Sequence, residues 1–137
     1  MKQPTHAAED LVQIGVLAER VGLSLRTVRY YEEIGLLEPA ARTTGGFRLY
    51  APEQEDRLRL LKTMKPLGFT LDEMRSLLTM IDDAARARSG SRRAAVLLQR
   101  IDELRQEISL RRGALLDQVK ATEQITGALD AAARGLT

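Results

Sequence analysis

The sequence predicts a mainly α-helical fold, with four short helices and a small β wing followed by one long helix. Three observations predict it. Apolar residues recur at three- and four-residue steps through most of the chain. Glycine, proline and capping residues divide residues 11–81 into short segments. Residues 92–122 contain no proline and only one glycine, so they form one long helix.

Two short helices joined by a tight turn come first, after a polar tail (residues 1–10) that we expect to be flexible. The apolar pattern becomes helical at Leu11, and Gly22 ends the first helix. Ser24 is a favourable N-cap for a second helix over residues 25–33. Two short helices with a glycine-containing turn form a helix-turn-helix. The inward face of the first helix is formed by Ile14, Leu17, Ala18 and Val21.

A small wing, residues 36–50, follows the second helix. Pro39 and the Gly45–Gly46 pair argue against a helix and favour a hairpin-like loop with glycine at its tip. Over residues 47–50, apolar and polar or aromatic side chains alternate, a pattern that predicts a short strand.

Two further helices complete the first 81 residues. Pro52 suits the first turn of a helix that continues to about Pro66. Gly68 ends this third helix, and Thr70 with Glu73 three residues later forms a capping box for the fourth helix. We therefore predict a single small core over residues 11–81.

A small, polar segment (residues 82–91) is the predicted linker, and residues 92–122 form the predicted dimerisation helix. At about 1.5 Å per residue this helix is a rod of roughly 45 Å, and its narrow apolar stripe needs a partner, most economically its own copy. Residues 123–137 are alanine-rich and are expected to form a short C-terminal tail or effector-proximal segment, to which a short helix can belong. The stripe comprises Leu97, Ile101, Leu104, Ile108, Leu115 and Val119.

Composition excludes several classes of protein. The chain has no cysteine and one histidine, His6, so it lacks thiolate metal sites, cysteine nucleophiles and histidine clusters. We therefore expect no enzyme activity, no metal and no cofactor. No stretch approaches the roughly 18 apolar residues of a membrane span, so the expected location is the cytoplasm. The net charge of +2 comes entirely from residues 82–137, so bulk charge does not predict a nucleic-acid partner.

The placement of particular cations does predict a nucleic-acid partner. The second helix carries polar side chains on its outward face, and arginine can hydrogen-bond guanine or phosphate while tyrosine can donate to phosphate. Residues 42–50 of the wing add two arginines without an acid, and two lysines share a face at the end of the third helix. The predicted DNA-binding residues are Arg26, Thr27, Arg29, Tyr30, Arg42, Arg48, Tyr50, Lys62 and Lys65.

Five motifs of the first 80 residues occur in a characteristic order: IGVLA (14–18), VGLS (21–24), RTVRYYEEIGLL (26–37), RTTGGFRLY (42–50) and LGFTLDEM (67–74). With these motifs the chain resembles the DNA-binding domain of MerR-family transcription regulators. The resemblance covers roughly residues 12–80 without a gap, and the long helix resembles the family's antiparallel dimerisation helix in place and length.

The resemblance implies a homodimer with two winged helix-turn-helix units on a near-palindromic operator in double-stranded promoter DNA. It also implies activation by distortion of the promoter spacer, with RNA polymerase as a partner. By position, Arg42 and Arg48 contact the DNA backbone, and Tyr50 either reaches phosphate or packs beneath the wing. Phe47 stands where the family often has tyrosine, so a hydroxyl contact is lost there.

Two alternatives remain at this point: a repressor or architectural DNA binder with no effector, and a coiled-coil interaction protein that does not bind DNA. The effector is also open. Metal-sensing relatives use cysteines that this chain lacks, and drug-sensing relatives carry a large C-terminal domain. Either no effector exists or a small molecule of unknown identity binds near Leu116, Ile125 and Leu129.

Overall fold

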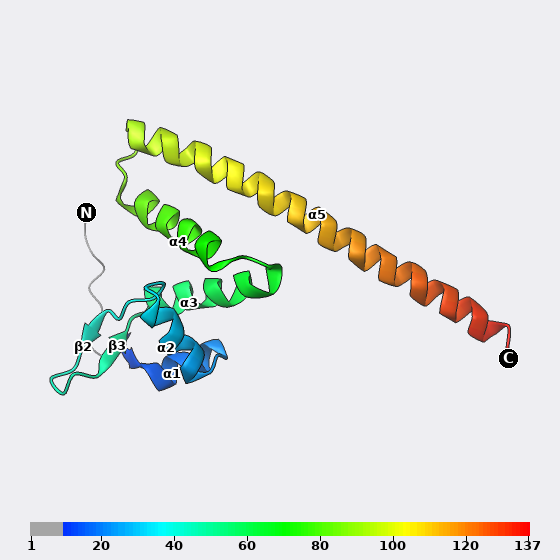
Figure 1. Cartoon of the computed structure of the whole chain (residues 1–137), viewed down its shortest axis with the longest axis horizontal. Helices are drawn as coiled ribbons and strands as arrows, with labels where there is room; N and C mark the ends of the chain where they lie inside the picture. Colours follow the sequence, from blue (N-terminus) through cyan, green and yellow to red (C-terminus); the bar gives the residue numbers. More distant parts are fainter. Residues whose placement is uncertain (1–9) are drawn as a thin grey trace. The chain divides into compact units, whose positions relative to one another are not determined.

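The computed structural model describes residues 10–137, so the tail expected over residues 1–10 lies outside the described residues except for Asp10. The chain divides into two units, Met1–Arg86 and Ala87–Thr137. The first unit has four α-helices and a small antiparallel sheet, whose arrangement can be followed in Figure 1. Its elements are β1 (Val12–Gln13), α1 (Ile14–Val21), α2 (Leu25–Glu33), β2 (Ala41–Arg42), β3 (Arg48–Tyr50), α3 (Pro52–Met64), the 3₁₀ turn η2 (Lys65–Leu67) and α4 (Leu71–Arg86).

Helices α1 and α2 form the predicted helix-turn-helix. Gly22 adopts a left-handed conformation (φ 77°), and its N–H donates to Ala18 O at 2.8 Å, which ends α1. Ser24 begins α2, because its Oγ accepts a hydrogen bond from the N–H of Thr27 at 3.1 Å. Both signals are local in sequence, and the predicted bounds of α2 are confirmed.

The wing contains the predicted hairpin, with a further strand that the sequence did not indicate. β3 is the central strand of the antiparallel order β1-β3-β2, and Gly46 supplies a positive φ at the hairpin tip. The prediction of helix from Leu11 is wrong for Val12–Gln13, which pair with Tyr50 and Leu49. Two residues are too few for a periodic pattern, and their pairing depends on a strand far along the chain.

α3 and α4 follow the predicted stop and start signals. The N–H of Thr70 donates to Glu73 Oε1 and the N–H of Glu73 donates to Thr70 Oγ1, both at 3.1 Å, so the predicted capping box is confirmed. α4 continues to Arg86, so the first five residues of the predicted linker (residues 82–91) are helical. No glycine or proline interrupts residues 82–86; the left-handed turn comes later, at Gly90 (φ 79°).

A single apolar cluster joins the elements of the first unit. A lysine from α3 also links two of its helices, because Lys62 Nζ donates to Val21 O at 2.8 Å, at the C-terminal end of α1. A cation at this end of a helix satisfies an unpaired carbonyl and interacts favourably with the helix dipole. The cluster includes Leu17, Val21, Val28, Tyr31, Leu36, Leu37, Tyr50, Leu58, Leu61, Met64, Phe69, Met74 and Leu78.

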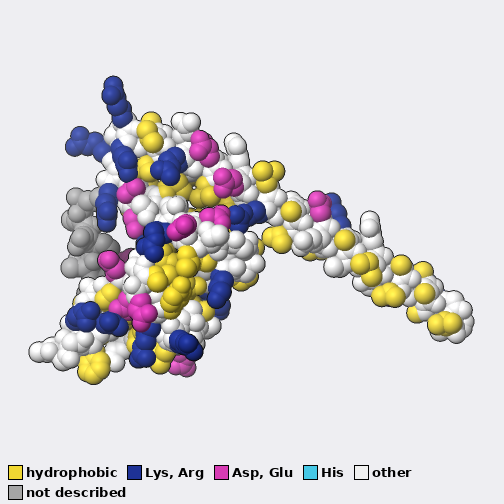
Figure 2. Space-filling view, viewed as in Figure 1, with side chains coloured by type: hydrophobic (Ala, Val, Ile, Leu, Met, Phe, Trp, Pro, Cys, Tyr) yellow, Lys and Arg dark blue, Asp and Glu magenta, His cyan; other side chains and the backbone are white. Residues whose placement is uncertain are grey.

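The second unit consists of helix α5 (Arg92–Arg134) and its flanking residues. Ser91 caps the helix by accepting from the N–H of Ala94 at 3.1 Å. α5 extends twelve residues beyond residue 122, so most of the expected tail is helical, because alanine has the highest helix propensity. Figure 2 shows apolar side chains following one another along α5.

The six residues of the predicted stripe differ in exposure. Leu97 is buried and Ile101 and Leu104 are partly buried, whereas Ile108, Leu115 and Val119 are 38%, 45% and 51% exposed. Large apolar side chains exposed in a row along a helix are typical of an interaction surface. Among residues 10–137, no helix is both long and apolar enough to cross a membrane.

Truncation of the core should destabilise the first unit. Leu61 is fully buried, so we expect Leu61→Ala to lower the free energy of unfolding by about 2–5 kcal/mol. Leu25→Ala is the matched control, because Leu25 is 41% exposed, and it should cost much less. Urea denaturation followed by far-ultraviolet circular dichroism measures both, and equal losses would contradict the assigned core.

Candidate nucleic-acid interface

Helix α2 has one buried and one exposed face. Val28 and Tyr31 lie in the core, whereas Arg26, Arg29 and Tyr30 are exposed. Thr27 is partly buried, and its hydroxyl accepts a hydrogen bond from Ser24 Oγ at 2.9 Å. The polar side chains predicted to contact DNA therefore share the face of α2 that points away from the core.

Arginines from α2 and from the wing surround a shared hollow of about 260 Å³. Arg29 comes from α2, whereas Arg42 and Arg48 come from the two strands of the hairpin. No carboxylate lines the hollow, so it favours an anion. Arg42 Nη1 also donates to Gly46 O at 3.4 Å within the wing. The remaining lining residues are Gln13, Ile14, Gly46 and Phe47.

A second hollow, of about 530 Å³, lies between α2 and the start of α4. Arg26, Thr27 and Tyr30 line one side, and Lys65 and Thr70 line the other. The structure therefore brings Lys65 beside the polar face of α2.

Lys62 does not line either of these hollows. Its ammonium group instead donates to the carbonyl of Val21, at the C-terminal end of α1. The spacing of Lys62 and Lys65 indicated a shared face, but the two side chains have different surroundings in the structure.

Glu32, which the sequence did not single out, links α2 to the wing. Its Oε1 lies 2.7 Å from Arg48 Nε, and its Oε2 accepts a hydrogen bond from the Tyr50 hydroxyl. Tyr50 is fully buried, so of its two expected roles the structure favours packing beneath the wing over a phosphate contact. Position offered one signal for Glu32, because it lies four residues after the buried Val28 and so near the same side of α2.

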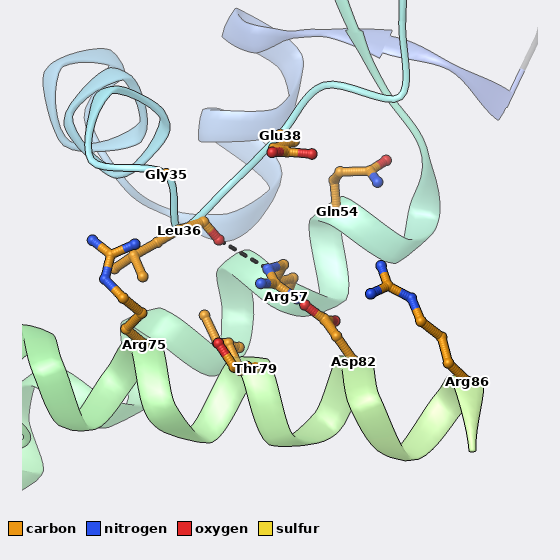
Figure 3. A pocket seen from close by; sticks show the side chains of 10 residues that line it. Gly35, Leu36, Glu38, Gln54, Arg57, Arg75, Thr79, Asp82 and Arg86 are labelled. Carbon is orange, nitrogen blue, oxygen red and sulfur yellow. Dashed lines mark hydrogen bonds and ion pairs between the residues drawn. The ribbon is translucent and has the colours of Figure 1, made fainter.

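The C-terminal end of α2 is held by two arginines around a third pocket, of about 430 Å³ (Figure 3). Arg57 Nε donates to Leu36 O at 2.8 Å, and Arg75 Nη2 donates to Ile34 O at 2.6 Å. Arg57 also pairs with Asp82 at 2.8 Å. These contacts fix the exit of α2 to α3 and α4, and the sequence did not reveal them because they join distant residues.

Two family profiles match the chain. Residues 12–81 match the family described as "MerR HTH family regulatory protein", and residues 55–121 match "MerR, DNA binding". The mercuric resistance operon regulatory protein of Bacillus cereus is 44% identical over 77 residues, 56% of this chain and 58% of that protein. The HTH-type transcriptional regulator HmrR of Rhizobium leguminosarum bv. viciae is 41% identical over 103 residues, 74% of this chain and 79% of that protein.

The chain spans less than two thirds of the Bacillus cereus protein. Among solved structures, that of HiNmlR, a MerR family regulator lacking the sensor domain and bound to promoter DNA, is similar with a TM-score of 0.58. The sequences are 20% identical, and the match covers 80% of this chain and 79% of that chain. This similarity shows the fold.

The buried hydroxyl of Tyr50 should make stability depend on alkaline pH. Burial, the hydrogen bond to Glu32 and the charge of Glu32 raise the pKa of Tyr50 above its ordinary value of 10.0. A raised tyrosine pKa stabilises the folded state below pH 10, and this contribution is lost as the pH rises toward the folded-state pKa.

We therefore expect the free energy of unfolding to fall more steeply above pH 10 in the wild type than in Tyr50→Phe. The difference in slope should reach at most about 1.4 kcal/mol per pH unit. Urea denaturation of both proteins between pH 8 and 11 measures it, and Tyr30 and Tyr31 are common to both. Parallel pH profiles would contradict the assigned environment of Tyr50.

Proposed function

Because the chain belongs to the MerR family of helix-turn-helix regulators, we propose that it is a sequence-specific DNA-binding transcription regulator. The observation that carries this proposal is the hollow beside the wing, which arginines from α2, β2 and β3 line and which no carboxylate lines. A basic surface built from a helix-turn-helix and a wing suits the phosphate backbone on either side of a groove.

The exposed residues of α2 have the role of base and phosphate contacts. Arg26 and Arg29 can each give two hydrogen bonds to a guanine, while Thr27 and Tyr30 can donate to phosphate oxygens. Arg42 and Arg48 of the wing, and Lys65 after α3, bind the backbone. Lys62, although exposed, donates to a carbonyl at the C-terminal end of α1, and Tyr50 is buried, so both support this surface by stabilising the fold.

We further propose that two copies pair through the apolar stripe of α5, in antiparallel orientation, and bind a near-palindromic operator. Half-sites read on one side of the duplex would lie about 34 Å apart, or a multiple of that distance. Distorting the promoter spacer costs of order 1–6 kcal/mol, which contacts from α2 and the wing would offset. RNA polymerase at that promoter, in the cytoplasm, is the further partner.

We do not propose a mercuric response, as in the name of the Bacillus cereus relative, for this chain, because it contains no cysteine to supply thiolate ligands. An effector, if one acts here, would have to bind the DNA-distorting state more tightly than the other state in order to shift the balance between them.

Immunoprecipitation of bound genomic fragments, followed by footprinting of the strongest site, tests the proposal. We expect protection over a near-palindrome within a promoter spacer. Protection elsewhere would replace activation by distortion with occlusion of the promoter. Binding that does not weaken with added salt would contradict phosphate recognition, since a phosphate binder releases counterions.

Removal of Arg29 should weaken operator binding. We expect Arg29→Ala to cost about 1–3 kcal/mol and to relax the preference at one base position, because a two-bond contact to guanine is lost. Arg88→Ala removes the same charge outside the predicted contact residues and is the control. Titration of labelled operator duplex measures both. An affinity of Arg29→Ala equal to that of the control would remove Arg29 from the interface.

A charge in the stripe of α5 should separate the two copies. Ile101→Glu places a carboxylate in the seam, so we expect monomers that lose cooperative operator binding. Leu110→Glu is the control, because Leu110 lies off the stripe and is 77% exposed. Analytical ultracentrifugation reports the mass of each variant, and a persistent Ile101→Glu dimer would show that the interface lies elsewhere.

A further inference from the structure

We propose that Glu32 is a positioning residue: it holds the Arg48 guanidinium so that its outer N–H groups face a backbone phosphate in the hollow beside the wing. This inference rests on the proposed function. It adds to that function a carboxylate that makes no DNA contact itself, and a buried tyrosine that orients the carboxylate.

The geometry places Glu32 between two groups of one strand. Glu32 belongs to the last turn of α2, and its side chain is 11% exposed. Each carboxylate oxygen has its own donor: Oε1 pairs with Arg48 Nε at 2.7 Å, and Oε2 accepts from the Tyr50 hydroxyl. Both donors come from β3, so one side chain of α2 fixes the central strand of the wing.

The contact through Nε leaves the end of the Arg48 side chain available. A guanidinium has five N–H donors, and the four on Nη1 and Nη2 lie beyond Nε. The Arg48 side chain is 43% exposed and borders the hollow that Arg29 and Arg42 also line. An arginine held at Nε loses less rotamer freedom when it binds phosphate, which is the advantage of preorganisation.

Tyr50 keeps the carboxylate in place. The ring is fully buried in the core, so its hydroxyl is a fixed donor. The charged groups that act on the pKa of Tyr50 are Glu32, which raises it, and Arg48 and Arg42, which lower it. The hydrogen bond from Tyr50 occupies Oε2, so Glu32 presents Oε1 to Arg48. The order of contacts from the core outward is Tyr50, Glu32, Arg48 and phosphate.

A competing role for Glu32 predicts a change in DNA affinity of the opposite sign when Glu32 is removed. If the carboxylate competed with phosphate for Arg48, its removal would free the arginine and strengthen DNA binding. If it positions Arg48, its removal weakens binding even though a negative charge near the DNA is lost. The sign of the change in affinity therefore separates the two roles.

The decisive experiment is a double-mutant cycle with Glu32→Ala and Arg48→Ala, measured by operator titration over a range of salt concentrations. We expect each single variant to bind about tenfold more weakly, the size of one charge-assisted hydrogen bond. Each should also lower the slope of log affinity against log salt by about 0.9, the loss of one phosphate contact. The double variant should bind no more weakly than Arg48→Ala alone.

Glu33→Ala is the matched control, because it removes the same charge from the next, exposed position of α2. It should leave the affinity unchanged or raise it slightly. Glu32→Gln keeps an oxygen acceptor and should restore part of the affinity, and thermal unfolding shows whether each variant is folded. Stronger binding by Glu32→Ala, or a full additional loss in the double variant, would overturn the proposal.

A measurement without DNA distinguishes failure of this inference from failure of the proposed function. In nitrogen-15 NMR spectra, the Nε–H of Arg48 should give a resonance protected from exchange, and Glu32→Ala should abolish the protection. An unprotected resonance in the wild type would overturn the positioning role whether or not DNA binds. If the resonance is protected but the wild type binds no specific duplex, the proposed function is wrong, and Arg48 does not bind a DNA phosphate even though Glu32 holds it.

Discussion

The orientation of α2 is the constraint on which the rest of the structure depends. Its apolar face is anchored by Val28 and Tyr31, its exit is tied by Arg57 and Arg75, and its last turn is tied to β3 through Glu32. An interface that discriminates between bases needs side chains held to within a fraction of an ångström, and a short helix does not achieve this alone. The three attachments supply that rigidity.

Local sequence signals predicted the elements, whereas the contacts between elements were beyond them. Caps such as Ser24 and the pair Thr70–Glu73 act within one helical turn, so their sequence pattern determines their geometry. β1, the Glu32 contacts and the carbonyl contact of Lys62 depend on residues 16 to 41 positions away. Nothing in a local window distinguishes these groups from solvated charges, so the sequence did not predict the contact between Lys62 and Val21.

The length of α5 shows that a single local signal can also receive too much weight in a prediction. The change to alanine-rich sequence after residue 122 suggested a separate tail, yet alanine continues a helix more readily than any other residue. α5 accordingly runs to Arg134 and is about 65 Å long. Ile125 and Leu129, exposed on this extension, lengthen the apolar surface that a second copy or another partner could cover.

The hydrogen bond from Lys62 to Val21, at the C-terminal end of α1, also restricts the turn before α2. A Cβ atom at Gly22 would lie 3.0 Å from Lys62 Nζ, and the backbone there has a φ of 77°. Any larger residue would therefore strain the peptide and crowd the ammonium group at the same time. The corner between the two helices is thus a point of low mutational tolerance, and natural variants of this chain should change its flanks while keeping glycine at its apex.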